Sequence, residues 1–230
     1  MRMRIRALAA VSLIAAALLL ARPAAAQDAL RGEGGSVTYF IARGEPDSRF
    51  QDEDRDLALW ALAAWERSAG GVLHFEAGPE QNALLRIYWV PAGGGEYGET
   101  RPLIVAGRRG AAVYIRPDTD ALGKDIAARA HADRLFRDTV VYLTCLHEIG
   151  HALGLEHTAD YRDVMYFFGF GGDIPKFFER YRVRLQSRDD IAKVSGLSSG
   201  DLAQLRALYG FDSAAAAEPE LTRARSAPPH

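Results

Sequence analysis

Three histidines within residues 147–157, together with Glu148, have the types and spacing of a catalytic metal site. His147 and His151 are four residues apart, so on a helix their imidazoles are separated by about 40° around the axis and about 6 Å along it. Both rings can therefore reach one metal ion. Glu148 is offset from His147 by about 100°, so it can reach a water molecule at the metal without being a ligand.

The residues after this helix supply a third ligand. Gly154 is expected to end the helix, because the left-handed conformation at a helix C-terminus costs least for glycine. The sharp turn that follows would bring His157 to the same ion. Three neutral imidazoles leave the fourth tetrahedral position of zinc open for water, which is typical of catalytic sites.

The full pattern His-Glu-x-x-His-x-x-Gly-x-x-His resembles the signature of the metzincin metallopeptidases. In that clan a methionine turn lies beneath the metal, and Met165, eight residues after His157, corresponds to its methionine. Thr158, and Phe167 in place of a tyrosine ligand, resemble the matrixin branch, which includes the matrix metalloproteinases. The resemblance implies a secreted zinc endopeptidase of bacterial style, with Glu148 as general base and Met165 as an apolar support.

Other interpretations of the motif are weaker. A structural zinc site would be closed by four protein ligands and would not need a carboxylate at Glu148. A lone His-Glu-x-x-His can occur in an ordinary core helix, but the extended pattern and Met165 argue against coincidence. The remaining functional alternative is a zinc-containing binding or adhesion protein with the same fold and little or no peptidase activity.

Residues 1–26 have the composition of an export signal. Three arginines among the first six residues precede an apolar run over residues 7–21, and Ala24-Ala25-Ala26 fits a signal peptidase site. We expect cleavage after Ala26, a secreted or periplasmic location, and no stable membrane insertion afterwards. An uncleaved N-terminal anchor is the alternative.

Length and composition indicate a single domain, and the resemblance implies protein or peptide as its substrate. The whole sequence has a formal net charge of −2, and the expected leader removes four arginines and no acids, so the remainder is more acidic. An acidic chain without a basic stripe argues against nucleic acid as a partner. Cys145 is the only cysteine, and its helical position, about 160° from His147, predicts that it faces the core. We expect a flexible segment over 27–35, the catalytic domain over 36–212 and a disordered tail over 213–230.

The expected fold class is α/β (α+β), a metzincin-like zincin fold. The resemblance implies a twisted mixed sheet, an active-site helix and a smaller C-terminal part that begins after Gly154, ends in a helix and borders the substrate cleft. Side-chain patterns predict strands and helices at the following positions: strands at 36–42, 72–77, 84–90, 103–106 and 111–116; a helix that Asp52 or Asp54 caps and Gly70-Gly71 ends; the metal helix from an Asp138 N-cap to about Leu153; and a last helix over 198–209, capped by Ser198 and Asp201. Glycines predict a loop over 91–102 and a four-residue turn over 107–110.

Two stretches leave alternatives open. Residues 167–197 are rich in phenylalanine and longer than the matrixin resemblance implies, so they either shape the specificity pocket or enlarge the core. Asp118, Asp120 and Asp125 offer the oxygen ligands of Ca²⁺, although isolated loop acids are usually solvated, and calcium is kept as a minor alternative. His131 lacks nearby histidine partners, so a second zinc is not expected. In matrixins the sheet's edge strand pairs with the substrate, and residues 103–106 are the candidate.

Overall fold

The computed structural model describes residues 30, 32–93 and 96–211. The expected leader and tail lie outside these residues. Short 3₁₀ helices span 33–35, 46–48, 80–82, 119–122, 168–170 and 188–190. The strands are β1 (Ser36–Ile41), β2 (His74–Ala77), β3 (Leu85–Trp89), β4 (Gly98–Val105) and β5 (Arg108–Ile115), and the helices are α2 (Asp54–Ser68), α3 (Lys124–Ala132), α4 (Arg134–Ala152), α5 (Ile174–Arg182) and α6 (Ser199–Tyr209).

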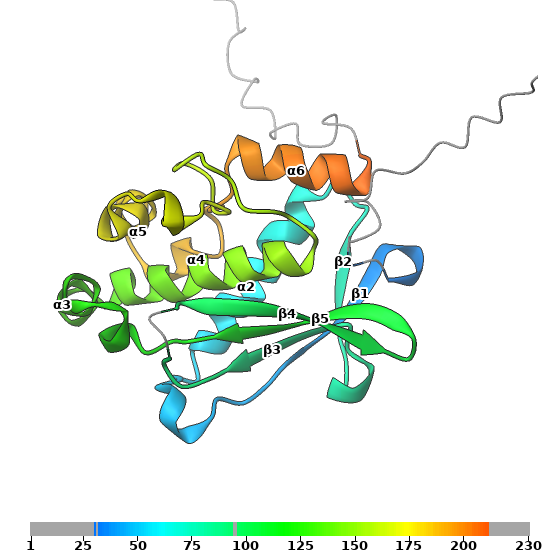
Figure 1. Ribbon diagram of the computed structural model, residues 1–230, viewed down its shortest axis with the longest axis horizontal. Coiled ribbons are helices and arrows are strands. Elements are labelled where there is room, and N and C mark those ends of the chain that lie inside the picture. Colours follow the sequence, from blue (N-terminus) through cyan, green and yellow to red (C-terminus); the bar gives the residue numbers. More distant parts are fainter. Residues whose placement is uncertain (1–29, 31, 94–95, 212–230) are drawn as a thin grey trace, which may run out of the picture.

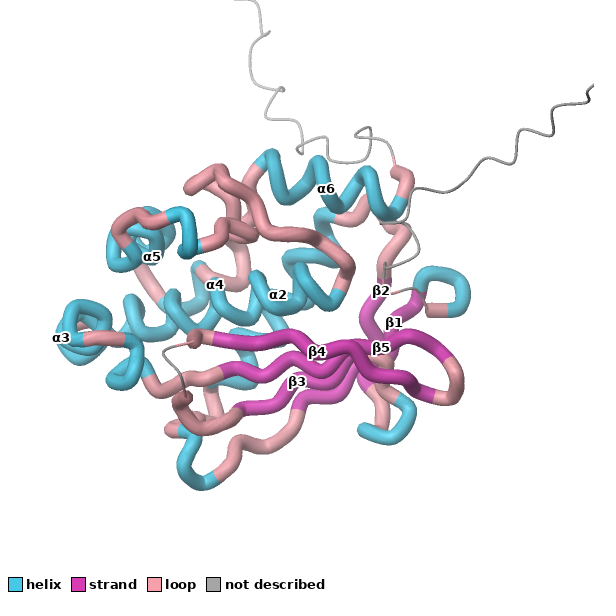
Figure 2. Tube along the Cα trace, viewed as in Figure 1, coloured by secondary structure: helices cyan, strands magenta, loops and turns pink. Residues whose placement is uncertain are grey.

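The five strands form one mixed sheet in the order β2-β1-β3-β5-β4 (Figure 2). Neighbouring strands are parallel except for β4, which runs antiparallel to β5 at the edge. The sheet, with helices packed on it, confirms the expected mixed α/β fold. β4 has an unpaired side because it is last in the order, as the expectation of an edge strand required.

The β4–β5 hairpin is longer than its sequence predicts. The ladder runs from Gly98 opposite Ile115 to Val105 opposite Arg108, so residues 98–102 are strand rather than loop. Glycine and proline lower the strand propensity of this stretch, but pairing with β5 decides its conformation. Ala106 and Gly107 make the turn, both with positive φ, in place of the expected four-residue turn over 107–110.

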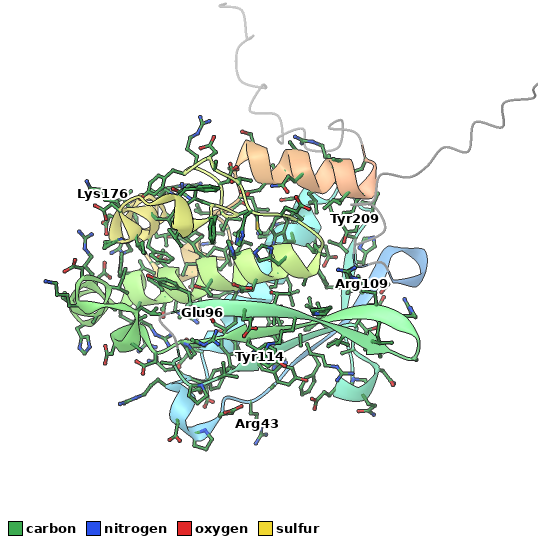
Figure 3. All side chains as sticks on the ribbon, viewed as in Figure 1. Arg43, Glu96, Arg109, Tyr114, Lys176 and Tyr209 are labelled. Atoms are coloured by element: carbon green, nitrogen blue, oxygen red, sulfur yellow. The ribbon has the colours of Figure 1, made fainter. Side chains whose placement is uncertain are left out.

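Helices α2 and α4 cover one face of the sheet, and α5 and α6 lie beyond α4, away from the sheet (Figure 1). Leu85, Ile87 and Trp89 alternate along β3 and are fully buried, as their spacing predicts. Tyr114 in β5 lies on the opposite face of the sheet (Figure 3). The buried Trp65 indole donates to the Leu146 carbonyl oxygen at 3.0 Å, which joins α2 to α4.

Helix α4 begins earlier than expected. Asp133 is its N-cap, because its carboxylate accepts hydrogen bonds from the N–H groups of Leu135 and Phe136. The prediction that Asp138 caps this helix is therefore wrong. Asp138 is buried within α4, where Arg188 lies 3.3 Å from its carboxylate. A partner 50 residues away in the sequence gives Asp138 its role, and local pattern could not reveal it.

The last helix begins and ends as predicted. Ser198 and Asp201 form a capping box, and Gly210 follows α6 in the left-handed conformation. The fully buried Asp201 carboxylate also accepts hydrogen bonds from the N–H groups of Val164 (2.9 Å) and Met165 (3.2 Å). Asp201 thus holds the expected methionine turn against α6.

The described part of the N-terminal segment packs on the same region. Leu30 is buried, and its carbonyl oxygen accepts a hydrogen bond of 2.9 Å from the Tyr209 hydroxyl at the end of α6. Within the described ranges, none of the helices has both the length and the hydropathy needed to cross a bilayer.

Replacement of Asp201 by alanine should destabilise the protein by about 3 kcal/mol, because buried N–H groups of the methionine turn lose their acceptor. Asp125→Ala is the matched control, since Asp125 is exposed in the first turn of α3 and should cost less than about 1 kcal/mol. Chemical denaturation measures both free energies of unfolding. Equal stability of the two variants would contradict the role given to Asp201.

Candidate metal centre and adjoining cavity

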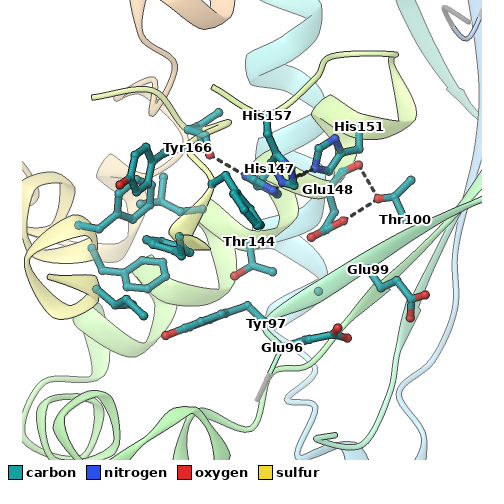
Figure 4. Close-up of a pocket in the computed structure, with 18 residues that line it drawn as sticks. Glu96, Tyr97, Glu99, Thr100, Thr144, His147, Glu148, His151, His157 and Tyr166 are labelled. Carbon is teal, nitrogen blue, oxygen red and sulfur yellow. Dashed lines mark hydrogen bonds between the residues drawn. The ribbon is translucent and has the colours of Figure 1, made fainter. Parts of the chain in front are cut away.

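The structure brings His147, His151 and His157 together. His147 and His151 project from the last turns of α4, and the chain then reverses at Gly154, whose φ of 98° is the left-handed conformation expected there. This reversal places His157 beside the other two rings (Figure 4). The Nε2 atom of His151 lies 3.1 Å from Nε2 of His147 and 3.1 Å from Nε2 of His157.

Backbone carbonyl groups orient two of the rings. Nδ1 of His147 lies 2.7 Å from the Val164 oxygen, and Nδ1 of His151 lies 2.9 Å from the Leu155 oxygen. A carbonyl oxygen only accepts, so each Nδ1 carries the proton and each Nε2 presents a lone pair. Converging lone pairs repel one another unless a cation lies between them. The donor set therefore fits a zinc ion, which takes imidazole nitrogen ligands and a tetrahedral geometry.

Burial keeps these histidines in the metal-binding form. It lowers the pKa of His147 and the pKa of His151 to about 4, and it also lowers the pKa of His157. All three imidazoles are consequently neutral near pH 7. Among the described residues, these three form the only group of histidine, cysteine or acidic side chains close enough to hold a metal ion.

Glu148 lies beside the histidines in a narrow space between α4 and β4. Its residue is only 6% exposed, and burial raises the pKa of the carboxyl, whereas a hydrogen bond from Thr100 lowers it. The Thr100 hydroxyl lies 2.7 Å from Oε2 of Glu148. A Cβ atom on Gly98 would be 2.6 Å from Cγ of Glu148, so this position must be glycine for the carboxylate to fit.

Met165 packs beneath α4, fully buried. A Cβ atom on Gly150 would lie 2.5 Å from Sδ of Met165, so the absence of a side chain at Gly150 lets the methionine approach the helix between the two histidines of α4. The preceding residue, Val164, supplies the carbonyl oxygen that accepts from His147. The methionine turn therefore contacts the histidine cluster through its backbone as well as its packing.

A short parallel bridge joins the loop of the third histidine to the methionine turn. The Thr158 N–H donates to the Met165 oxygen at 2.9 Å, and the Phe167 N–H donates to the Thr158 oxygen at 3.1 Å. The Phe167 ring lies over the His157 ring, with 4.8 Å between centroids. Phe167 has no ligand atom, so it contacts the cluster only by packing.

A cavity of about 480 Å³ opens next to the histidines and Glu148. It lies between β4 and α4 on one side and the segment after Gly154 on the other, where the cleft was expected. Its polar lining residues besides the histidines include Glu96, Glu99, Thr100, Thr144 and Glu148. Its walls away from the histidines are mainly apolar and aromatic: Tyr97, Leu143, Val164, Phe168, Ile174, Phe177 and Phe178.

The aromatic segment both enlarges the core and lines the cavity. Phe177, Phe178 and Tyr181 are buried on α5 and enlarge the core, while Phe168 and Phe177 pack ring against ring and line the cavity. Arg180 of the same helix donates to the Asp163 carbonyl oxygen at 3.2 Å and lies 4.0 Å from the Phe177 ring centroid. These contacts hold the cavity wall against the loop that leads to Met165.

The carboxylates of Asp118, Asp120 and Asp125, which were considered for calcium, do not meet at one point. Asp118 caps the 3₁₀ helix that follows it, and Asp120 lies 2.5 Å from Nε2 of His131, so their carboxylates have partners within the chain. Asp125 is exposed at the start of α3. Cys145 is fully buried, as expected from its place on the helix. Thr100 was missed because its stretch was predicted to be loop.

Parts of this sequence are similar to known proteins. The sequence model of the matrixin family matches residues 31–198. Interstitial collagenase from Sus scrofa is 29% identical over 173 residues, which cover 73% of this chain and 32% of the collagenase. The chain thus spans about a third of the length of that relative.

Proposed function

Because the chain belongs to the matrixin family of metallopeptidases, we propose that it is a zinc-dependent endopeptidase with its active centre at His147, His151, His157 and Glu148. The observation that carries this proposal is the convergence of three Nε2 atoms beside a buried carboxylate at the end of an apolar cavity. A protein that only held zinc would not need the buried Glu148. Protein or peptide is the proposed substrate.

Zinc bound to the three imidazoles would act as a Lewis acid that polarises the scissile carbonyl and lowers the pKa of water. The hydrogen bonds from Nδ1 of His147 and His151 to backbone oxygens hold the rings in the required tautomer. The Glu148 carboxylate accepts a proton from the attacking water while the water oxygen bonds to the carbonyl carbon. The same carboxyl then donates this proton to the amine nitrogen as the C–N bond breaks.

The apolar cavity is proposed to receive the side chain that follows the scissile bond. It adjoins Glu148, and aromatic rings from residues 168–178 form its far wall. A large apolar side chain loses no favourable hydration when it enters the apolar part of this cavity, whereas a charged one does.

We further propose that residues 1–26 direct export and are removed, and that residues 36–212 form the catalytic domain. The basic start, apolar run and three alanines support the first proposal, which the N-terminal residue of the exported protein would test. The family match over 31–198 supports the second.

Glu148→Gln should lower kcat/KM on a protein substrate by about 100- to 10,000-fold, because the amide cannot accept the proton of water. Zinc content should be unchanged. Glu156→Gln is the matched control, since Glu156 is an exposed glutamate in the turn that follows α4. Fluorogenic peptide cleavage, with and without a chelator, measures the rates. Full activity of Glu148→Gln would exclude the role as base, and an inactive, zinc-loaded wild type would favour a binding protein.

His157→Ala should weaken zinc binding by more than about 100-fold, because it removes one of three ligands. His131→Ala is the control, since His131 lies exposed and paired with Asp120 and should leave the affinity within about threefold. Competition with a chromophoric chelator gives both affinities. Retention of wild-type affinity by His157→Ala would show that the third ligand lies elsewhere.

Phe168→Ala should reduce the preference for leucine over alanine after the scissile bond by about 3- to 10-fold, because the cavity wall loses a ring. Phe170→Ala is the control in the same 3₁₀ helix, since the Phe170 residue is 64% exposed and lies outside the cavity lining. Two peptides that differ only at this position provide the ratio of kcat/KM values. Equal effects of the two variants would show that the cavity does not determine this preference.

A further inference from the structure

The Thr100 hydroxyl lies between two oxygen atoms of the same glutamate. Its Oγ1 is 2.7 Å from the carboxylate Oε2 of Glu148 and 2.9 Å from the backbone oxygen of Glu148 (Figure 4). A hydroxyl has one proton, so it donates to only one of these acceptors at a time. Rotation about the Cβ–Oγ1 bond is enough to change from one acceptor to the other.

Strand β4 is arranged to make this contact. Gly98 and Thr100 are two residues apart, so both face α4 from the same side of the strand. Gly98 leaves the space that the Glu148 side chain occupies, and Thr100 supplies a polar partner at its end. Pairing of Thr100 with Val113 in β5 fixes the position of the hydroxyl along the strand.

We propose that Thr100 is a positioning residue that orients the Glu148 carboxylate for the attacking water. This inference rests on the proposed peptidase function. The hydroxyl donates to Oε2 and leaves Oε1 to accept the proton of the attacking water. The Glu148 backbone oxygen is a second acceptor within reach, so the hydroxyl keeps a partner on α4 in either rotamer.

The hydroxyl gives the buried carboxylate a neutral donor from β4. A methyl group would leave the buried carboxylate without a donor on that side. The alternative is that Thr100 only packs β4 against α4, in which case its hydroxyl would affect stability and not turnover.

The test compares Thr100→Val, which keeps the shape and removes the hydroxyl, with Thr100→Ser, which keeps the hydroxyl. In the zinc-loaded protein, Thr100→Val should lower kcat by about 10- to 100-fold, with KM within about twofold and zinc content unchanged. Thr100→Ser should restore kcat to within about threefold of wild type. Thr38→Val is the matched control, because Thr38 is also half-buried in the sheet but lies in β1, outside the cavity lining.

Failure of the inference is distinguishable from failure of the proposed function. An active, chelator-sensitive wild type with unchanged kcat in Thr100→Val would overturn only the role of Thr100. A wild type without such activity would overturn both. An equal loss of kcat in Thr100→Ser and Thr100→Val would also overturn the inference, because it would show that the hydroxyl does not orient Glu148.

A double variant tests whether Thr100 acts through Glu148. In a Glu148→Gln background, Thr100→Val should change the residual rate by less than about threefold, since the group that it orients is already gone. A larger further loss would show that Thr100 acts on something else and would overturn the inference. Thermal unfolding of each variant identifies any loss of folded protein, and Thr100→Ser then decides the outcome if Thr100→Val does not fold.

Discussion

The convergence of three imidazole rings on one point is the constraint on which the rest of this structure depends. The Nε2 atoms converge to 3.1 Å, and neutral rings in this arrangement are costly unless the chain holds them or a cation joins them. Backbone oxygens of Val164 and Leu155 hold two rings by their Nδ1 protons. Val164 is in turn held by the buried Asp201 of α6, so the last helix supports the histidine cluster.

Close approach of backbones is the second requirement. Gly98 lets the edge strand approach Glu148, and Gly150 lets the methionine turn approach α4. Each glycine lacks a side chain, and the space is occupied by Glu148 at Gly98 and by Met165 at Gly150. The carboxylate and the methionine are consequently both buried against the last turns of α4, which also carry His147 and His151. Local strand and helix propensity is given up at both positions for this geometry.

Most regular elements could be predicted from local pattern. The alternation along β3, the helical spacing of α2 and the capping box of α6 match the structure closely, because each depends on neighbours in the sequence. The errors occur where distant partners decide. Residues 98–102 became strand because β5 pairs with them, and Asp138 became a buried ion-pair partner because Arg188 packs beside it. The aromatic segment could not be assigned to core or cavity, since its rings do both.

By itself, the sequence determined which side chains can perform the chemistry, because the spacing of His147, Glu148, His151, Gly154 and His157 is a local property of one helix and one turn. Tertiary structure alone decided what surrounds them. Thr100, Asp201 and the cavity wall come from segments tens of residues away, and their distances to the site follow from sheet pairing and helix packing. Such contacts leave no periodic pattern in the sequence, because their partners meet only when the layers pack.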